Sequence, residues 1–279
     1  MALSRRQFFM TAAGSAAALA VLKSQIAVLK ASPLGIPIGS QTYPHRTRIA
    51  SGEFAGLLKD MKAAGIDQVE LCDPWNYAEF KPLMDGKAAK KMLDDAGIKA
   101  VSCHVGIKVY RTQHKDVLNW AHDVGLTQLS TADLGNVTKD GRTRMTGNWT
   151  TVDWIKEAAD EYNAIAKVSK AAGFGQVLHN EGFCNSRTAD GRMTYPILIE
   201  HLDPALVGMQ FQMSSMTSVG NPITYFTIYP GRFWSAHMQG VNAGTGMRAA
   251  AMPTLPDKTA APTGRGAGAA PAAPARSEE

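Results

Sequence analysis

One pattern of apolar and polar positions recurs along the chain from residue 35 onward. An amphipathic helical stretch is followed by a small residue, a glycine and a bulky apolar residue, and then by a short apolar run that ends in polar groups. The glycine falls where the end of a helix needs a residue that tolerates positive φ, and the apolar residue after it can fold back on the helix. The pattern occurs at residues 64–66, 96–98, 124–126 and 172–174. It predicts four units in which a helix leads into a strand.

Apolar spacing independently predicts two of the helices. Residues 155–169 carry apolar side chains three and four positions apart, which places those side chains on one face of a helix. Thr150 with Asp153 fits a capping box at the start of this helix. A shorter helix is predicted from the same spacing of Phe54, Leu57, Leu58 and Met61.

Three further strands bring the predicted total to seven. They are expected at residues 35–43, 207–213 and 232–238. Alternation of strands and helices over this length calls for a parallel sheet, which is either doubly wound or closed into a barrel. The first strand is not followed by the G-x-G-x-x-G sequence that a dinucleotide-binding fold would carry there.

Polar residues at the carboxyl ends of the predicted strands favour the barrel. A (β/α) barrel gathers all of these ends on one rim, where barrel enzymes keep their active sites. The sequence therefore predicts an α/β fold of the TIM-barrel type that lacks the eighth strand and helix unit. The residues that would lie on its rim are Gln41, Tyr43, Glu70, His104, Asp133, His179, Glu181, Gln212 and His237.

The first 31 residues differ from the body of the chain. They contain four basic residues and no acidic residue, and the paired Arg5 and Arg6 precede a small, apolar stretch at residues 10–22. Paired arginines before a short apolar stretch predict a twin-arginine signal peptide at residues 1–31. We therefore expect the protein to meet the twin-arginine export machinery and to be periplasmic or secreted. If the signal were retained, it would anchor the protein to the membrane.

The remaining sequence divides into a barrel domain at residues 32–240 and a tail at residues 241–279. The tail is rich in Ala, Pro and Gly and has no apolar periodicity, which predicts disorder because it cannot bury enough surface to fold. Removing the 4 basic residues of the signal from the 29 of the chain leaves 25 basic against 24 acidic side chains. A nearly neutral body without a Lys/Arg-rich run excludes the electrostatic footprint of a nucleic-acid-binding protein.

The strongest local candidate for chemistry lies at the end of the fifth predicted strand. There an apolar run ends abruptly in His179, Asn180 and Glu181. A histidine and a carboxylate two residues apart on a strand point to the same side, so both could reach one metal ion or one sugar hydroxyl. An ordinary strand-to-loop transition is the alternative, because such short motifs recur by chance. The position of this motif on a rim of polar strand ends favours a site.

In order and spacing, the segments resemble those of the xylose isomerase-like barrel superfamily of sugar phosphate isomerases and epimerases. The resemblance covers about residues 35–240. It is carried by I-G-S-Q-T-Y at 38–43, A-A-G-I-D-Q-V-E-L at 63–71, V-S-C-H at 101–104, L-H-N-E-G-F at 178–183, L-D-P-A-L-V-G-M-Q-F-Q at 202–212 and G-R-F-W-S-A-H-M-Q-G at 231–240. No single segment is diagnostic, but their order along the chain is.

The resemblance implies one divalent cation held by the ends of strands five to eight. Carried over position by position, its ligands would be Glu181 or His179 on strand five, Gln212 on strand six and His237 on strand seven. Gln212 stands where an Asp is usual, and the glutamate of strand eight has no counterpart. A set of one carboxylate, one or two imidazoles and one amide is expected to bind Mn²⁺, Zn²⁺, Mg²⁺ or Co²⁺ more weakly than the usual set.

The resemblance also implies an enzyme that isomerises or epimerises a carbohydrate by proton transfer next to a carbonyl. In that chemistry the cation polarises the carbonyl or an adjacent hydroxyl, and a carboxylate moves the proton. Glu181, Glu70 and His104 are the candidate catalytic residues. A keto-sugar lyase or hydratase of the same superfamily is one alternative, and a non-catalytic sugar-binding or degenerate barrel is another.

An incomplete barrel also bears on assembly. Without an eighth unit, the edges of strands one and seven lack partners, and unpaired edges invite pairing with another chain. We therefore expect either a homodimer formed through this opening or marginal stability.

Overall fold

The computed structural model describes residues 38–132, 152–181, 187–216 and 223–239. The predicted signal peptide at 1–31 and the predicted tail at 241–279 lie outside the described residues, as do Asp133 on the predicted rim and Thr150 of the predicted capping box. These four predictions therefore stay predictions.

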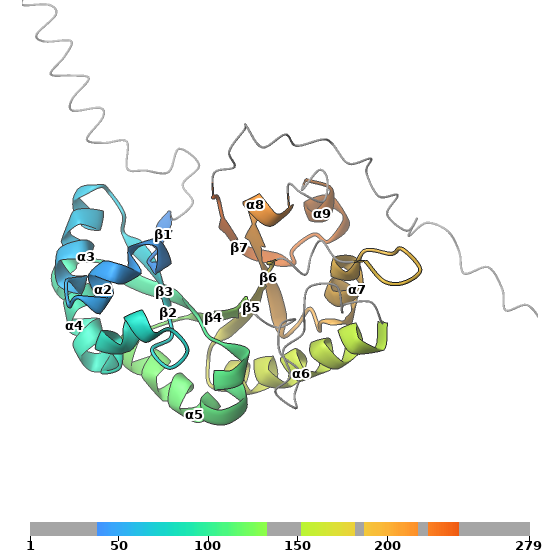
Figure 1. Cartoon of the computed structure of the whole chain (residues 1–279), viewed down its shortest axis with the longest axis horizontal. Coiled ribbons are helices and arrows are strands. Elements are labelled where there is room, and N and C mark those ends of the chain that lie inside the picture. The colour runs from blue at the N-terminus through green and yellow to red at the C-terminus, as the bar shows by residue number, and fades with distance from the viewer. Residues whose placement is uncertain (1–37, 133–151, 182–186, 217–222, 240–279) are drawn as a thin grey trace, which may run out of the picture.

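Seven parallel strands form one curled sheet in chain order (Figure 1). Each strand pairs in parallel with the next one along the chain. The prediction of a TIM-type barrel short of one unit is confirmed, since seven strands alternate with helices and no eighth strand occurs among the described residues. The strands are β1 (Gly39–Gln41), β2 (Gln68–Cys72), β3 (Lys99–His104), β4 (Gln128–Thr131), β5 (Gly175–His179), β6 (Val207–Gln212) and β7 (Phe233–His237).

Helices lie along the outer face of the curled sheet (Figure 1). The two helices predicted from apolar spacing are confirmed as α3 and α6, and both bury the predicted apolar positions. None of the helices in the described segments is long and apolar enough to cross a membrane. The α-helices are α2 (Arg46–Ala50), α3 (Phe54–Ala63), α4 (Gly86–Ala96), α5 (Ile107–Val124), α6 (Val152–Ala171), α7 (Thr194–His201), α8 (Met213–Met216) and α9 (Ile223–Ile228), and the 3₁₀ helices are η1 (Tyr43–His45) and η2 (Ala78–Leu83).

The four glycine-containing turns end their helices in the same way. Gly65, Gly97, Gly125 and Gly173 all have φ between 65° and 91°. In each turn the backbone N–H of the following apolar residue donates to a carbonyl five residues earlier, as Ile98 does to Leu93 at 2.9 Å. This is the hydrogen bond of a Schellman motif, which the positive φ of the glycine permits. The repeated sequence pattern therefore fixes where each of these helices gives way to its strand.

The two faces of the sheet have different chemistry because successive strand residues point to opposite sides. The outward-facing residues include Leu71, Leu129 and Phe211, which are buried in the apolar core. The interior of the curled sheet instead contains buried polar side chains from β2, β3, β4 and β6, which are Glu70, Ser102, Ser130 and Gln210. TIM barrels usually fill this space with branched apolar residues. The buried polar residues in the interior of this sheet therefore indicate a functional site.

A bulge shapes the last strand. Met209 is opposite Phe233, while Gln210 is opposite Ser235, so Trp234 is the extra residue in β7. The Trp234 ring lies directly against the backbone of Gly208, where a Cβ atom would overlap it. The side chain of Trp234 remains 44% exposed.

Candidate functional site

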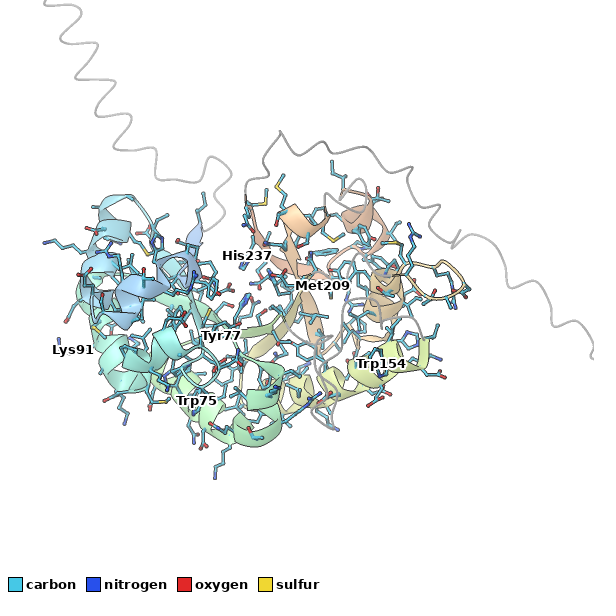
Figure 2. All side chains as sticks on the ribbon, in the orientation of Figure 1. Trp75, Tyr77, Lys91, Trp154, Met209 and His237 are labelled. Atoms are coloured by element: carbon cyan, nitrogen blue, oxygen red, sulfur yellow. The ribbon has the colours of Figure 1, made fainter. Side chains whose placement is uncertain are left out.

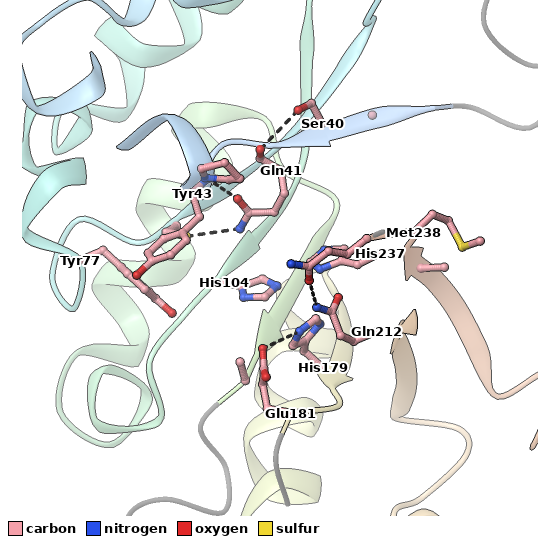
Figure 3. A pocket seen from close by; sticks show the side chains of 16 residues that line it. Ser40, Gln41, Tyr43, Tyr77, His104, His179, Glu181, Gln212, His237 and Met238 are labelled. Carbon is pink, nitrogen blue, oxygen red and sulfur yellow. Dashed lines mark hydrogen bonds and ion pairs between the residues drawn. The ribbon is translucent and has the colours of Figure 1, made fainter. Parts of the chain in front are cut away.

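A cavity of about 670 Å³ opens at the carboxyl ends of the strands (Figure 3). Its lining comes from both edges of the sheet, with Ser40 from β1 and His237 from β7, as well as from the strands between. Seven of the nine residues predicted for the rim line it, and these are Gln41, Tyr43, His104, His179, Glu181, Gln212 and His237. The carboxyl-end rim thus brings together side chains that are up to 196 residues apart in the sequence, from Gln41 to His237.

Three histidines meet at the floor of this cavity. His104, His179 and His237 end β3, β5 and β7, and side chains from alternate strands of a barrel share one layer. One ring nitrogen from each lies within 4.8 Å of the others. The ring of His179 is 4.8 Å from that of His104 and 4.6 Å from that of His237, measured between centroids. Figure 2 shows His237 between the two ends of the curled sheet, whereas Lys91 projects from the outer surface of the molecule.

Glu70 lies beneath the histidines and contacts two of them. Its Oε1 atom is 3.0 Å from Nε2 of His104 and 2.7 Å from Nε2 of His237. Its Oε2 atom accepts hydrogen bonds from Ser102 Oγ at 2.7 Å and from Gln210 Nε2 at 2.6 Å. A β-bulge in the pairing of β2 with β3 places Ser102 directly opposite Glu70. All four partners are donors, so each oxygen of the carboxylate has two donor neighbours.

The side-chain amide of Gln210 extends this network. Because its nitrogen donates to a carboxylate, its oxygen must be the acceptor for its other neighbours. Oε1 of Gln210 is 2.8 Å from Nε2 of His104, 3.1 Å from Nδ1 of His179 and 3.0 Å from Oγ of Ser130. These contacts place a proton on Nε2 of His104 and on Nδ1 of His179.

His179 and Glu181 then form an unusual pair. With Nδ1 of His179 protonated, the lone pair of its Nε2 in the neutral ring faces Oε1 of Glu181 at 3.1 Å. Burial lowers the pKa of His179, although the nearby Glu181 acts in the opposite direction, so the neutral ring is favoured. A lone pair and a carboxylate oxygen that converge in this way are suited to share a cation or a donor hydrogen.

The charge on the two carboxylates is maintained by the histidines. Burial alone would favour protonated Glu70, but its contacts with His104 and His237 hold the pKa of this carboxyl well below its ordinary value. The pKa of His104 is raised, because the attraction of Glu70 outweighs burial. The contact with His179 lowers the pKa of Glu181. Both Glu70 and Glu181 are therefore ionised near neutral pH.

Gln212 contributes a buried amide to the cavity. Its nitrogen donates to Ser214 Oγ at 3.0 Å and to Oε1 of Gln239. Its Oε1 atom is buried and has no hydrogen-bond partner among the described residues. The backbone of Gln212 is held by Asn180, whose side chain accepts from its N–H at 2.7 Å and donates to its carbonyl at 3.2 Å. An unpaired buried acceptor is costly, so this oxygen points to a bound donor or cation.

Aromatic side chains form the opposite wall. Tyr43 and Tyr77 line the cavity and meet edge to face, with ring centroids 5.9 Å apart. Tyr43 was predicted at the end of the first strand, but β1 ends at Gln41 and Tyr43 begins the 3₁₀ helix η1. Among the described residues that line the cavity there is no Lys or Arg. The cavity therefore combines polar acceptors and imidazoles on one side with an aromatic wall on the other.

The rim residues could be predicted from the sequence, but the buried polar residues beneath them were missed. Ser102, Ser130 and Gln210 were not singled out, although strand alternation puts Gln210 on the same side as Gln212. His104 was predicted as a catalytic residue, and the structure groups it with the two predicted histidine ligands. Glu70, also predicted as catalytic, does not line the cavity but supports residues that do.

Neither family models nor curated protein sequences match the chain. Solved structures do. A sugar phosphate isomerase/epimerase from Parabacteroides distasonis superposes with a TM-score of 0.58 at 18% identity, over 75% of this chain and 77% of that one. An AP endonuclease of family 2 from Brucella melitensis gives a TM-score of 0.51 at 12% identity, over 72% and 78% of the two chains.

A third similar structure is a fusion of a xylose isomerase-like TIM barrel with 4-hydroxyphenylpyruvate dioxygenase. It gives a TM-score of 0.50 at 13% identity, over 72% of this chain and 31% of that longer one. At these identities the similarity is one of fold. The chain shares the TIM-barrel fold of these proteins.

Proposed function

We propose that this protein is a divalent-metal-dependent sugar isomerase or epimerase that moves a proton next to a carbonyl. The observation that carries the proposal is the convergence of His104, His179 and His237 on one point at the carboxyl-end rim. The similar fold of a sugar phosphate isomerase/epimerase supports it. The position agrees with the general placement of active sites in barrel enzymes.

The residues present fit a divalent cation. Three imidazoles are within reach of one ion, and neutral imidazole is a preferred ligand of Zn²⁺, Co²⁺ and similar ions. Glu181 adds a carboxylate beside His179, and Gln212 adds an amide oxygen that lacks a partner in the described structure. These are the donors that would hold the ion. When bound, it would supply charge to polarise a carbonyl or hydroxyl oxygen of the sugar.

Glu181 is the residue best placed to move the proton. Its side chain is 45% exposed at the cavity, and its lowered pKa keeps it ionised and able to accept a proton from the carbon next to the carbonyl. Glu70 is only 7% exposed, and both of its oxygens are taken by the network. The other predicted catalytic carboxylate therefore supports the site from below, and His104 is left to contact the cation or the substrate.

The aromatic wall would orient the sugar. A tyrosine ring of this wall offers a face for the C–H groups of a sugar, while the polar groups opposite can bond its hydroxyls. With Glu181 as the single carboxylate lining the described cavity, one group would take and return the proton on the same face. That arrangement suits an aldose–ketose isomerase. Epimerisation at one carbon needs a second group on the opposite face.

Metal analysis tests the proposal directly. The purified protein should contain a divalent metal, and the double variant His179→Ala, Glu181→Ala should lose it. Isomerase activity on free aldoses and ketoses should fall by about 100-fold or more, in line with the contribution of a general base. The double variant His122→Ala, Glu157→Ala removes an exposed histidine and an exposed carboxylate from α5 and α6 and serves as the matched control.

The outcomes separate the candidate functions. A metal-free protein, or a double variant that keeps its metal in full, would refute the metal-dependent enzyme. Metal-bound protein that dehydrates or cleaves a keto-sugar would instead identify the lyase or hydratase alternative. Sugar binding without turnover by a metal-bound protein would identify a non-catalytic sugar-binding barrel.

Export is a separate part of the proposal. The support is the sequence of residues 1–31, with paired arginines before an apolar stretch and no acidic residue. Replacing Arg5 and Arg6 by Lys should retain the full-length protein in the cytoplasm of the expressing cell, as fractionation and immunoblotting would show. Equal export of this variant and the unaltered protein would exclude the twin-arginine route.

A further inference from the structure

We infer that Glu70 is a positioning residue that determines which ring nitrogen His237 and His104 present to the bound cation. The inference rests on the proposed metal site and concerns its second layer of residues. It assigns to a buried side chain of β2 control over ligands that belong to β3 and β7.

The contacts of the three histidine rings carry the argument. Nε2 of His104 and Nε2 of His237 are both bonded to Oε1 of Glu70, at 3.0 and 2.7 Å. Nδ1 of His179 is bonded to Gln210. Each ring is thus held through one nitrogen by the layer beneath. The second nitrogen is left for a ligand, and it is Nδ1 in His104 and His237 and Nε2 in His179.

Glu70 holds His237 without help from any other described side chain. His104 has a second acceptor in Oε1 of Gln210, at 2.8 Å, whereas the His237 ring bonds Glu70 alone among the described side chains. The rings of His104 and His237 are stacked, with an angle of 10° between their planes and 5.5 Å between their centroids. A single carboxylate oxygen thus accepts from both of these stacked rings.

A purely structural role does not call for a carboxylate at this position. Burying a charge in a barrel interior is unfavourable unless it is fully bonded, and an apolar side chain of similar size would fill the same space. All four neighbours of Glu70 are donors, namely Ser102, Gln210, His104 and His237. A glutamine at position 70 would turn its own N–H₂ group toward two of these donors in either orientation. The position therefore requires an ionised acceptor.

Outer carboxylates of this kind fix the tautomer and orientation of metal-binding histidines. With Glu70 outside the set of direct ligands, the donors at the centre of the site are three imidazoles. Imidazole suits Zn²⁺, Co²⁺ and Ni²⁺, whereas Mg²⁺ and Ca²⁺ prefer oxygen. The inference therefore includes a preference for a transition metal over Mg²⁺.

Two measurements on the full chain test the role of Glu70. Titration with Co²⁺, followed by visible absorption, reports both the affinity and the symmetry of the site, and Mg²⁺ competition reports selectivity. Long-range ¹H–¹⁵N spectra of the metal-free protein report which nitrogen of each ring carries the proton. The variants are Glu70→Gln and Glu70→Ala, and the control is Glu161→Gln, which breaks the half-buried pair of Glu161 with Arg111 between α5 and α6.

The expected result is specific to the histidines. Both variants at position 70 should lose Co²⁺ affinity by about 10- to 100-fold, the usual cost of removing an outer-shell partner, and should change the Co²⁺ spectrum. His237 should carry its proton on Nε2 in the unaltered protein and become a mixture of tautomers in Glu70→Ala. Glu161→Gln should lower the melting temperature without changing the Co²⁺ spectrum or the His237 tautomer.

Each contrary outcome has a separate meaning. If the unaltered protein binds no Co²⁺ or Zn²⁺, the metal dependence of the proposed function fails. If it binds Co²⁺, but Glu70→Ala binds it with the same affinity and spectrum, the inference about Glu70 fails while the proposed function stands. An unchanged His237 tautomer in Glu70→Ala would also overturn it, and this readout does not require metal.

Discussion

Gln212 shows how one side chain can set the strength of the site. It occupies a position where a carboxylate would offset the charge of a cation, and its buried amide oxygen has no partner in the described residues. Gln212→Asp should therefore tighten binding of Co²⁺ or Mn²⁺ by roughly tenfold, or about 1.4 kcal/mol. Isothermal titration of the metal-free protein measures this.

The control for that substitution places the same charge elsewhere in the cavity. Gln41 also lines it but contacts the backbone N–H of Tyr43 and the thiol of Cys72 instead of a histidine. Gln41→Glu should change metal affinity by less than Gln212→Asp. Equal effects of the two substitutions would mean that the added charge acts on the whole cavity and that Gln212 has no special position.

Tyr229 provides a test of burial at a residue outside the site. Its hydroxyl is buried and donates to Glu200 at 3.1 Å, and both burial and the nearby carboxylate raise its pKa. The folded protein therefore keeps this proton at a pH where the unfolded chain loses it. The resulting stability is complete below the ordinary tyrosine pKa of about 10 and declines as the pH rises above it.

The measurement compares Tyr229→Phe with the unaltered protein. Above pH 10 the free energy of unfolding should fall less steeply in the variant, by up to about 1.4 kcal/mol per pH unit, which is the limit for one proton. Below pH 9 the two curves should run parallel, separated by the loss of one hydrogen bond. Parallel curves across the whole range would show that Tyr229 ionises equally in both states.

At the level of elements, the bulge of β7 depends on a glycine in the neighbouring strand. A Cβ atom at Gly208 would overlap the ring of Trp234, so Gly208→Ala should displace the ring and destabilise the protein by about 1–3 kcal/mol, as overpacking does. Gly175 on β5 is the matched control, because a Cβ atom there would meet the same ring at 3.7 Å, an ordinary contact. Chemical denaturation of Gly208→Ala and Gly175→Ala should therefore give a large and a small effect.

Equal stability of the two glycine variants would contradict the described packing of Trp234. Fluorescence offers a second reading, because displacement of the half-exposed Trp234 ring should shift its emission in Gly208→Ala only.

The elements that could be predicted from the sequence are those whose causes are local. A glycine and the apolar residue after it fix the end of a helix, and apolar spacing fixes the buried face, so the α3 and α6 helices and the strands that follow such glycines were predictable. The bulge at Trp234 was not, because it depends on the empty space above Gly208. Gln210 was missed for the same reason, since its partner Glu70 lies 140 residues away.

The candidate site was predictable in its outline. Parallel strands place their carboxyl ends together, so His104, His179, Glu181, Gln212 and His237 could be assigned to one rim from their positions alone. The separate roles of these residues were not predictable. They depend on which ring nitrogen meets which acceptor, and hydrogen-bond partners across the barrel have no signature in the local sequence.

At the level of the whole molecule, the two edges of the described sheet determine how copies can meet. β1 and β7 are the terminal strands of the seven-stranded sheet, and each has one edge without a partner strand in the described structure. We expect a homodimer formed through these edges, visible in sedimentation velocity as a concentration-dependent shift. Ile38 directly precedes β1 in the sequence, and it is 43% exposed.

Two isoleucine substitutions test that assembly. Ile38→Lys places a charge beside the β1 edge and should favour the monomer, since edge charges oppose strand pairing. Ile223→Lys changes an isoleucine of α9 that is 65% exposed and should leave the assembly unchanged. A stable monomer at all concentrations with a high melting temperature would contradict both the dimer and the alternative of marginal stability.

The buried hydrogen bonds that link Ser102, Glu70, Gln210 and His179 also limit how this sequence can change over evolution. Each member satisfies its neighbour, so replacing one leaves a buried donor or acceptor unpaired, while replacing several together with apolar residues removes the penalty. The effects of mutations in this chain of contacts should therefore be strongly non-additive. Losing the site by one substitution at a time would require passing through destabilised proteins. This would preserve the arrangement of histidines even in descendants whose substrate has changed.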